Sequence, residues 1–180
     1  MCEMRGISVW MFSKIVMLVF LLVTFSTVIG FMRLTSDKVA TDSAQALAMQ
    51  IKDAIETTLY TNTISSQTVV PIPKTLPETG GSSDVTKLKS FTVNVDSTLS
   101  PDGKIVYVAI GWGDNPPTYT AASSFLTSKG VQLKPSAVEG FKLLSSKYRY
   151  FIVKKDASNG IELCFQACSS SYFDSSCTAC

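Results

Sequence analysis

The hydrophobic pattern of the chain changes from continuous to periodic after Met32. Residues 15–32 read IVMLVFLLVTFSTVIGFM and contain no charge, and they lie between Lys14 and Arg33. As an α-helix this segment covers roughly 27 Å, close to the roughly 30 Å hydrocarbon core of a bilayer. We therefore expect one transmembrane helix, with Trp10 among the headgroups and Lys14 extended toward the surface. A secretory signal cleaved after Gly30 and a buried soluble helix are the alternatives.

The segment that follows has the pattern of an amphipathic helix. Its apolar side chains recur at intervals of three and four: Ala40, Ala44, Leu47, Ala48, Ile51, Ile55 and Leu59. No proline or glycine occurs from residue 31 to 60, so we expect one helix over residues 7–60, although Ser36 could cap a separate second helix. The stripe predicts packing of Leu47 and Ile51 on the head domain, with Asp53 on the outer face. A coiled coil with another copy is the alternative.

The rest of the chain predicts a linker followed by a small head domain. Residues 61–89 are rich in Ser, Thr, Pro and Gly and allow a short strand at residues 68–72. They include the letters LPETG of a sortase signal, but no apolar segment and basic tail follow at the C-terminus, so we do not expect sorting. Within residues 90–180, the alternation of apolar and polar residues predicts two hairpins. Two further segments, separated by the helix-breaking residues Gly130 and Pro135, are predicted to be short helices. The predicted hairpin strands are residues 91–95 with 104–112 and residues 147–155 with 160–167, and the predicted helices are residues 120–129 and 136–147.

Four cysteines crowd the segment 164–180, and Cys2 lies beyond the apolar segment. The even number predicts two disulfides among Cys164, Cys168, Cys177 and Cys180 that tie the C-terminus to the last strand. Nested pairing (Cys164 with Cys180, Cys168 with Cys177) is favoured over crossed pairing. A four-thiolate zinc site and a redox pair at residues 177–180 are the alternatives. Disulfides place the C-terminal domain outside the cytosol and the N-terminus inside it. The expected fold is thus α+β: a long N-terminal helix packed on a small antiparallel β-rich head with a disulfide-closed C-terminus.

Composition restricts the chemistry available to the chain. The sequence has no histidine, which removes Ser-His-Asp and Cys-His pairs and His-ligated metal sites, so we expect no enzyme, no cofactor and no metal site. The net charge of +2 arises within the segment 1–36, and the remainder sums to zero. Because a neutral remainder has no long-range field to hold phosphate backbones, nucleic acid is not an expected partner.

The N-terminal architecture resembles the type IV pilin superfamily, particularly its archaeal branch. The resemblance rests on Arg5-Gly6-Ile7-Ser8 ahead of the apolar helix and on a helix that changes from apolar to amphipathic before a β-rich head. It implies a leader of residues 1–6 that a prepilin peptidase removes between Gly6 and Ile7. Two positions depart from the pattern: Met11 stands where bacterial pilins carry a glutamate, which archaeal members often lack, and Lys14 interrupts the apolar stretch.

The expected function is therefore assembly of a surface filament or a secretion-related pseudopilus. The apolar half of the helix anchors the subunit in the lipid bilayer and then packs against other pilin-like subunits, identical or different. We expect this packing to use Ile15, Leu18, Leu22 and Gly30, since small residues permit close approach of helices. The alternative is a single-pass membrane protein that does not polymerise and whose extracellular head binds a ligand or partner subunit.

Overall fold

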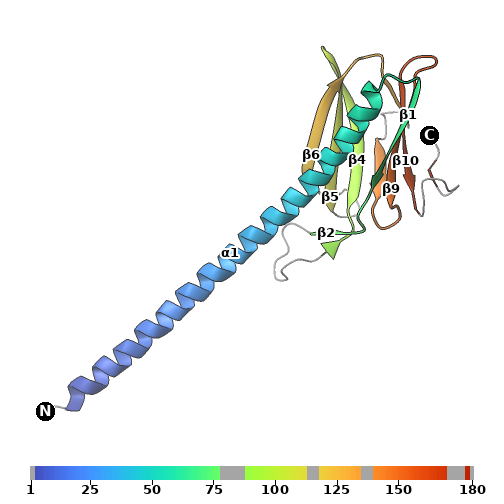
Figure 1. The fold of residues 1–180 in the computed structure, drawn as a ribbon. Helices are drawn as coiled ribbons and strands as arrows, with labels where there is room; N and C mark the ends of the chain where they lie inside the picture. The colour runs from blue at the N-terminus through green and yellow to red at the C-terminus, as the bar shows by residue number, and fades with distance from the viewer. Residues whose placement is uncertain (1–2, 78–87, 113–117, 135–139, 170–176, 179–180) are drawn as a thin grey trace.

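One continuous helix dominates the structure. The computed structural model describes residues 3–77, 88–112, 118–134, 140–169 and 177–178. Helix α1 (Glu3–Tyr60) runs for 58 residues, about 87 Å at 1.5 Å per residue, and projects far beyond the head (Figure 1). Its segment Trp10–Met32 has a mean hydropathy of 2.6 and is not buried at all, so this helix is long and apolar enough to cross a membrane. No break occurs at Ser36, so the separate second helix is excluded.

The described residues of the head form two four-stranded sheets and one short strand pair, which confirms an α+β fold. Nearly all strand pairs are antiparallel, as expected, but β7 pairs with β10 in parallel. The first sheet has the order β1 (Ser65–Pro71), β9 (Tyr150–Asp156), β10 (Glu162–Cys168) and β7 (Gln132–Lys134). The second has the order β6 (Thr118–Thr127), β5 (Gly103–Trp112), β4 (Thr92–Ser100) and β8 (Phe141–Leu144), and β2 (Leu76–Pro77) pairs with β3 (Leu88–Lys89).

Both predicted hairpins are present. In β4–β5, Ser100 pairs with Gly103 across a tight turn. A Cβ atom at Gly103 would collide with the carbonyl oxygen of Thr127 on β6, so the close approach of these strands requires glycine. In β9–β10, Asp156 pairs with Glu162, and Gly160 in the connecting loop has a φ of 121°. The turn residues thus set the register of both hairpins.

Both predicted short helices are wrong where the structure describes them. Residues 120–127 belong to β6, and residues 141–144 form β8; residues 136–139 lie outside the described part of the chain. Pairing with β5 places Ala121 and Phe125 toward the core, and pairing with β4 does the same for Phe141 and Leu143. Weak local helix preference therefore yields to tertiary strand pairing and burial.

Part of the expected linker belongs to the head. The predicted strand at residues 68–72 is present but longer, because β1 covers Ser65–Pro71 and pairs along its length with β9. The backbone N–H of Ile72 then donates to the carbonyl of Arg149 at 2.7 Å. The chain that follows the helix therefore returns at once along the first sheet and forms its edge.

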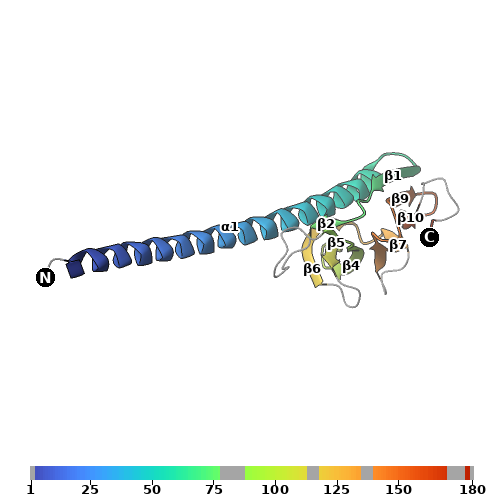
Figure 2. The same ribbon diagram turned by 90° about the horizontal axis from the view of Figure 1, so that it is seen from below.

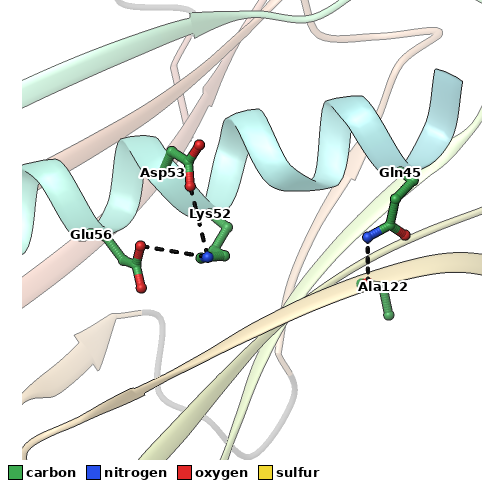
Figure 3. A network of polar contacts seen from close by, with 5 residues as sticks. All are labelled: Gln45, Lys52, Asp53, Glu56 and Ala122. Atoms are coloured by element: carbon green, nitrogen blue, oxygen red, sulfur yellow. Dashed lines mark hydrogen bonds and ion pairs between the residues drawn. The ribbon is translucent and has the colours of Figure 1, made fainter. Parts of the chain in front are cut away.

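The predicted apolar stripe of α1 is buried in the core. Its seven members are 0–6 % exposed, and α1 contacts β6 and β5 of the second sheet and β1 and β9 of the first (Figures 1 and 2). Gln45 Nε2 donates to the carbonyl of Ala122 on β6 at 3.1 Å (Figure 3). On the outer side Lys52 forms ion pairs with Asp53 at 3.8 Å and Glu56 at 3.7 Å (Figure 3), contacts that stabilise little at a surface. The helix therefore closes the open side between the two sheets.

The two sheets are joined by three phenylalanine rings. Phe141 of β8 lies 5.5 Å from Phe151 of β9 and 6.0 Å from Phe165 of β10, measured between ring centroids. Phe151 and Phe165 are stacked at 5.8 Å, and all three rings are buried. Aromatic contacts at such distances stabilise beyond the burial of their area, so this cluster holds the sheets together away from the helix.

Truncating the stripe should destabilise the head. We expect Leu47→Ala and Ile51→Ala each to lower the free energy of unfolding by about 2–5 kcal/mol, because the large side chains leave cavities in a packed core. Asp53→Ala is the control, and its exposed position predicts a change within about 0.5 kcal/mol. The measurement is urea unfolding of the full chain in mild detergent, followed by fluorescence of Trp112 with Trp10→Phe as background. Equal midpoints for the three variants would contradict packing of the stripe on the head.

Candidate membrane anchor and assembly surface

The apolar half of α1, Trp10–Met32, has exposed side chains on every face and is called the bare half below. The expected packing residues Ile15, Leu18 and Leu22 are each 60–62 % exposed, and their spacing of three and four places them on one face of the helix. A Cβ atom at Gly30 would meet nothing within 4 Å, so this position offers open space. The monomer provides no partner for these four residues within its described part, which leaves them available to lipid or to another helix.

Both threonine hydroxyls within the apolar segment are satisfied by the helix itself. Thr24 Oγ1 donates to the carbonyl of Phe20 at 2.7 Å, and Thr27 Oγ1 donates to the carbonyl of Thr24 at 2.8 Å. An unsatisfied hydroxyl is costly in hydrocarbon, where water cannot compensate it. These bonds to the preceding turn therefore make both threonines compatible with an apolar environment.

Trp10 and Lys14 form a contact at the beginning of the apolar segment. The Lys14 ammonium lies 4.7 Å from the centroid of the Trp10 ring, one helical turn away. An ammonium at this distance is attracted by the negative face of an indole ring. Trp10 is 60 % exposed, so the pair remains accessible. Tryptophan and lysine are typical of the region where a transmembrane helix meets the headgroups.

The expected processing site lies at the free end of the helix. Gly6 and Ile7 fall within the first turns of α1, about 50 Å of helix before the head begins at Ala40. This end of the chain is remote from every strand (Figure 1). A peptidase that acts at the membrane surface would therefore reach residues 6 and 7 without contacting the head.

The C-terminal end of α1 is capped by a lysine from the first sheet. Lys155 of β9 is 8 % exposed, and its Nζ donates to the carbonyls of Leu59 at 2.8 Å and Thr61 at 2.7 Å. The last turn of α1 contains no basic residue. Because the last carbonyls of a helix have no intrahelical donors and carry partial negative charge, an ammonium stabilises this end.

Two further hydroxyl contacts complete this helix end. Ser66 Oγ donates to the carbonyl of Thr58 at 3.0 Å. Thr58 Oγ1 is buried, 2.8 Å from the carbonyl of Ala54 and 2.6 Å from the hydroxyl of Thr68. The end of α1 is thus joined to β1 and β9, which fixes the direction in which the helix leaves the head.

Sequence reasoning missed Lys155 as a structural residue. The signal was present, because Phe151, Val153 and Lys155 share one face of a strand and the first two are fully buried. A lysine at the inward position of a strand end needs acceptors, and the uncapped helix supplies them. Only the position of β9 beside the helix end identifies those acceptors.

The C-terminal cysteines close the tail onto β10. Cys168 and Cys177 form a disulfide, the inner pair of the nested arrangement. Cys164 is also disulfide-bonded, whereas Cys180, its expected partner, lies outside the described residues. Since disulfide sulfurs are not thiolates, Cys168 and Cys177 cannot ligate zinc, which excludes the four-thiolate site.

The tail also extends the sheet. The backbone N–H of Thr178 donates to the carbonyl of Ala167 at 2.9 Å, and the Ala167 N–H donates to Thr178 Oγ1 at 2.9 Å. Gln166 Nε2 donates to the carbonyl of Thr178 at 3.0 Å. Thr178 therefore covers the edge of β10 beyond the point where β7 ends.

A small polar hollow of about 110 Å³ lies beside the β9–β10 turn. It is smaller than typical ligand pockets of about 300–1,000 Å³. Hydrogen bonds from the backbone N–H and hydroxyl of Ser158 lower the pKa of Asp156, which lies on its rim. Among the described residues, no group of three or more His, Cys, Asp and Glu side chains is arranged to hold a metal ion. We therefore regard the hollow as a feature of the turn. The exposed half of α1 is the surface that remains available to a partner.

Comparisons with protein-family models, with curated proteins and with solved structures found no match to this chain.

Removing the ammonium of Lys155 should destabilise the head. Lys155→Met keeps the aliphatic stem but leaves the carbonyls of Leu59 and Thr61 without their donor, so we expect a loss of about 2–3 kcal/mol. Lys154→Met is the matched control: the neighbouring lysine is only half-buried, and we expect a change within about 0.5 kcal/mol. Urea unfolding in detergent, followed by Trp112 fluorescence, measures both. A loss shared equally by the two variants would contradict the capping role of Lys155.

Proposed function

We propose that this chain is a pilin-like structural subunit that is anchored in a membrane by α1 and assembles through the same helix. One observation carries the proposal: a single helix has a first half that is apolar and bare and a second half built into the head. A helix made only to anchor a domain needs no rigid extension into it. The short Arg5-Gly6-Ile7-Ser8 match to prepilin leaders adds support from the sequence.

The disulfide supports the orientation of this subunit. Disulfides persist in oxidising compartments outside the cytosol, so the pair Cys168–Cys177 favours an extracellular head. The N-terminus then lies on the cytoplasmic side, where the bilayer surface meets Trp10 and Lys14. The segment Trp10–Met32 has 23 residues, enough to cross the hydrocarbon core with some tilt.

Assembly would exchange lipid contacts for helix contacts. Lipid tails are as apolar as leucine, so the gain comes from close packing between long helices rather than from hydrophobicity. The exposed face with Ile15, Leu18 and Leu22 and the open space at Gly30 suit such packing. The Lys155 cap and the buried stripe keep each head at a fixed angle to its helix, which a regular filament requires.

A second candidate is a membrane-anchored accessory protein that does not polymerise. The contact between Lys14 and Trp10 favours it, because such a pair suits a helix that stays at one depth in the bilayer. In that case the extracellular head would bind a ligand or partner subunit directly.

The N-terminus of the native protein distinguishes these functions. We expect intact mass and N-terminal sequencing of the protein from its own membrane to give a chain that begins at Ile7 and retains the helix. Electron microscopy of sheared surface material should show filaments that contain this chain. Gly6→Leu should block cleavage and assembly together, whereas Gly30→Ala, at an open position, leaves cleavage unchanged.

Other N-termini would overturn the proposal in different ways. A native chain that begins at Met1 and stays in the membrane would support the accessory protein. A chain that begins near Phe31 would identify a secreted head without an anchor.

A further inference from the structure

Exposed residues with heptad spacing, here called the seam, occur in two stretches of α1. In the bare half it consists of Met11, Lys14, Leu18, Leu21 and Phe25, and in the head half of Val39, Asp42, Ala46, Met49 and Asp53. All of these residues are exposed, and none belongs to the stripe that packs on the head. Spacings of three and four repeated in this way are typical of residues that meet a parallel helix. The two stretches share one heptad register, because the second is displaced from the first by four whole heptads.

Lys14 is the one charge in the bare stretch of this seam. Its described contact is with the ring of Trp10 on its own helix. If the bare half packs against another helix, the Lys14 ammonium loses water and needs a carboxylate. A partner helix must therefore place an acidic side chain opposite residue 14.

Asp42 is the acidic residue of the head half that fits this position. It is exposed and forms no ion pair within the described residues, whereas Asp53 pairs with Lys52. A shift of four heptads, about 42 Å along the helix, places Asp42 opposite Lys14. The same shift places Met11 opposite Val39, Leu18 opposite Ala46 and Leu21 opposite Met49, which are apolar pairs. The last pair of the seam is Phe25 opposite Asp53.

Other heptad shifts do not provide a free carboxylate. A shift of three heptads places Thr35 opposite Lys14, and a shift of five heptads places Met49 there. A shift of six heptads places Glu56 there, but Glu56 already pairs with Lys52 at 3.7 Å. The other acidic residues in the second half of α1 do not lie a whole number of heptads from residue 14: Asp37 and Asp53. Among these whole-heptad shifts, a shift of four therefore places a carboxylate that has no ion pair among the described residues opposite Lys14.

We infer that two copies of this chain pack with parallel α1 helices staggered by about 42 Å, so that Lys14 of one copy pairs with Asp42 of the next. This inference rests on the proposed assembly function and adds its register. The occupant of the exposed seam is a second copy. Its bare half lies along the outer face of the first copy's head half.

Disulfide cross-linking tests the register. Filaments are prepared from the full chain with Cys2→Ser and the pair Lys14→Cys and Asp42→Cys, then oxidised and separated without reductant. Because residues 14 and 42 lie about 42 Å apart on one helix, any bond between them joins two copies. We expect dimers and higher multimers from this pair. The matched control pair, Lys14→Cys and Asp53→Cys, and each single variant should yield monomers.

Charge reversal tests the ion pair separately. Lys14→Asp and Asp42→Lys should each lower the filament yield at least about tenfold, because two like charges then face each other. The combined variant should restore the yield to within about threefold of the wild type. Asp102→Lys, at an exposed position in the β4–β5 turn outside the seam, is the control and should change it by less than about twofold. Membrane extraction of each variant confirms that the subunit is inserted.

The outcomes separate this inference from the function on which it rests. Wild-type filaments without a bond between residues 14 and 42 would overturn the register and leave the pilin-like function intact. Failure of the combined variant to recover while both single variants lose assembly would also overturn the pairing. Absence of wild-type filaments would overturn the function and, with it, this inference.

Discussion

Burial of one stripe of α1 between two sheets is the interaction on which the rest of the structure depends. The stripe residues from Ala40 to Leu59 are nearly inaccessible, and they contact β6 and β5 on one side and β1 and β9 on the other. The sheets meet each other through Phe141, Phe151 and Phe165, so the helix fills the side that these rings leave open. The many alanines of the stripe keep the backbone of α1 close to β6, where Gln45 reaches the edge carbonyl of Ala122. Without the helix, both sheets would expose apolar faces and unpaired edges.

The helix end and the C-terminal tail are secured by different chemistry at opposite ends of β9 and β10. At one end Lys155 caps the carbonyls of Leu59 and Thr61. At the other end the disulfide Cys168–Cys177 holds Thr178 against Ala167. Both devices compensate for a core of modest size, in which a single uncapped helix end or a frayed strand edge would be a large fraction of the stability. They also make the orientation of the helix relative to the head a property of the folded domain.

A rigid helix that is bare at one end has consequences for what the chain can do. Its first half has no partner among the described residues of the monomer, and its hydroxyl groups at Thr24 and Thr27 already bond to the preceding turn. Lipid can surround such a segment, and so can other helices of the same kind. Lys14 limits the second possibility, because a buried ammonium requires an opposite charge. The heptad seam contains the exposed Asp42, so the same sequence offers such a charge, and the proposed anchoring and assembling functions of α1 are compatible with each other.

The sequence by itself determined the features that depend on local pattern: the extent of α1, its apolar stripe and both hairpins. It left nested and crossed disulfides open, and the structure decided for Cys168 with Cys177. Each of these local features is set by neighbours in the chain, through continuous or periodic apolar residues and turn residues. Only the tertiary structure decided that residues 120–127 and 141–144 are strands, because their short mixed segments take the conformation that pairing with β5 and β4 allows. It also decided the parallel position of β7 and the role of Lys155. Lys155 and its two acceptors are far apart in the chain, so no local pattern connects them, and only the packing of β9 beside the helix end brings the ammonium to the carbonyls.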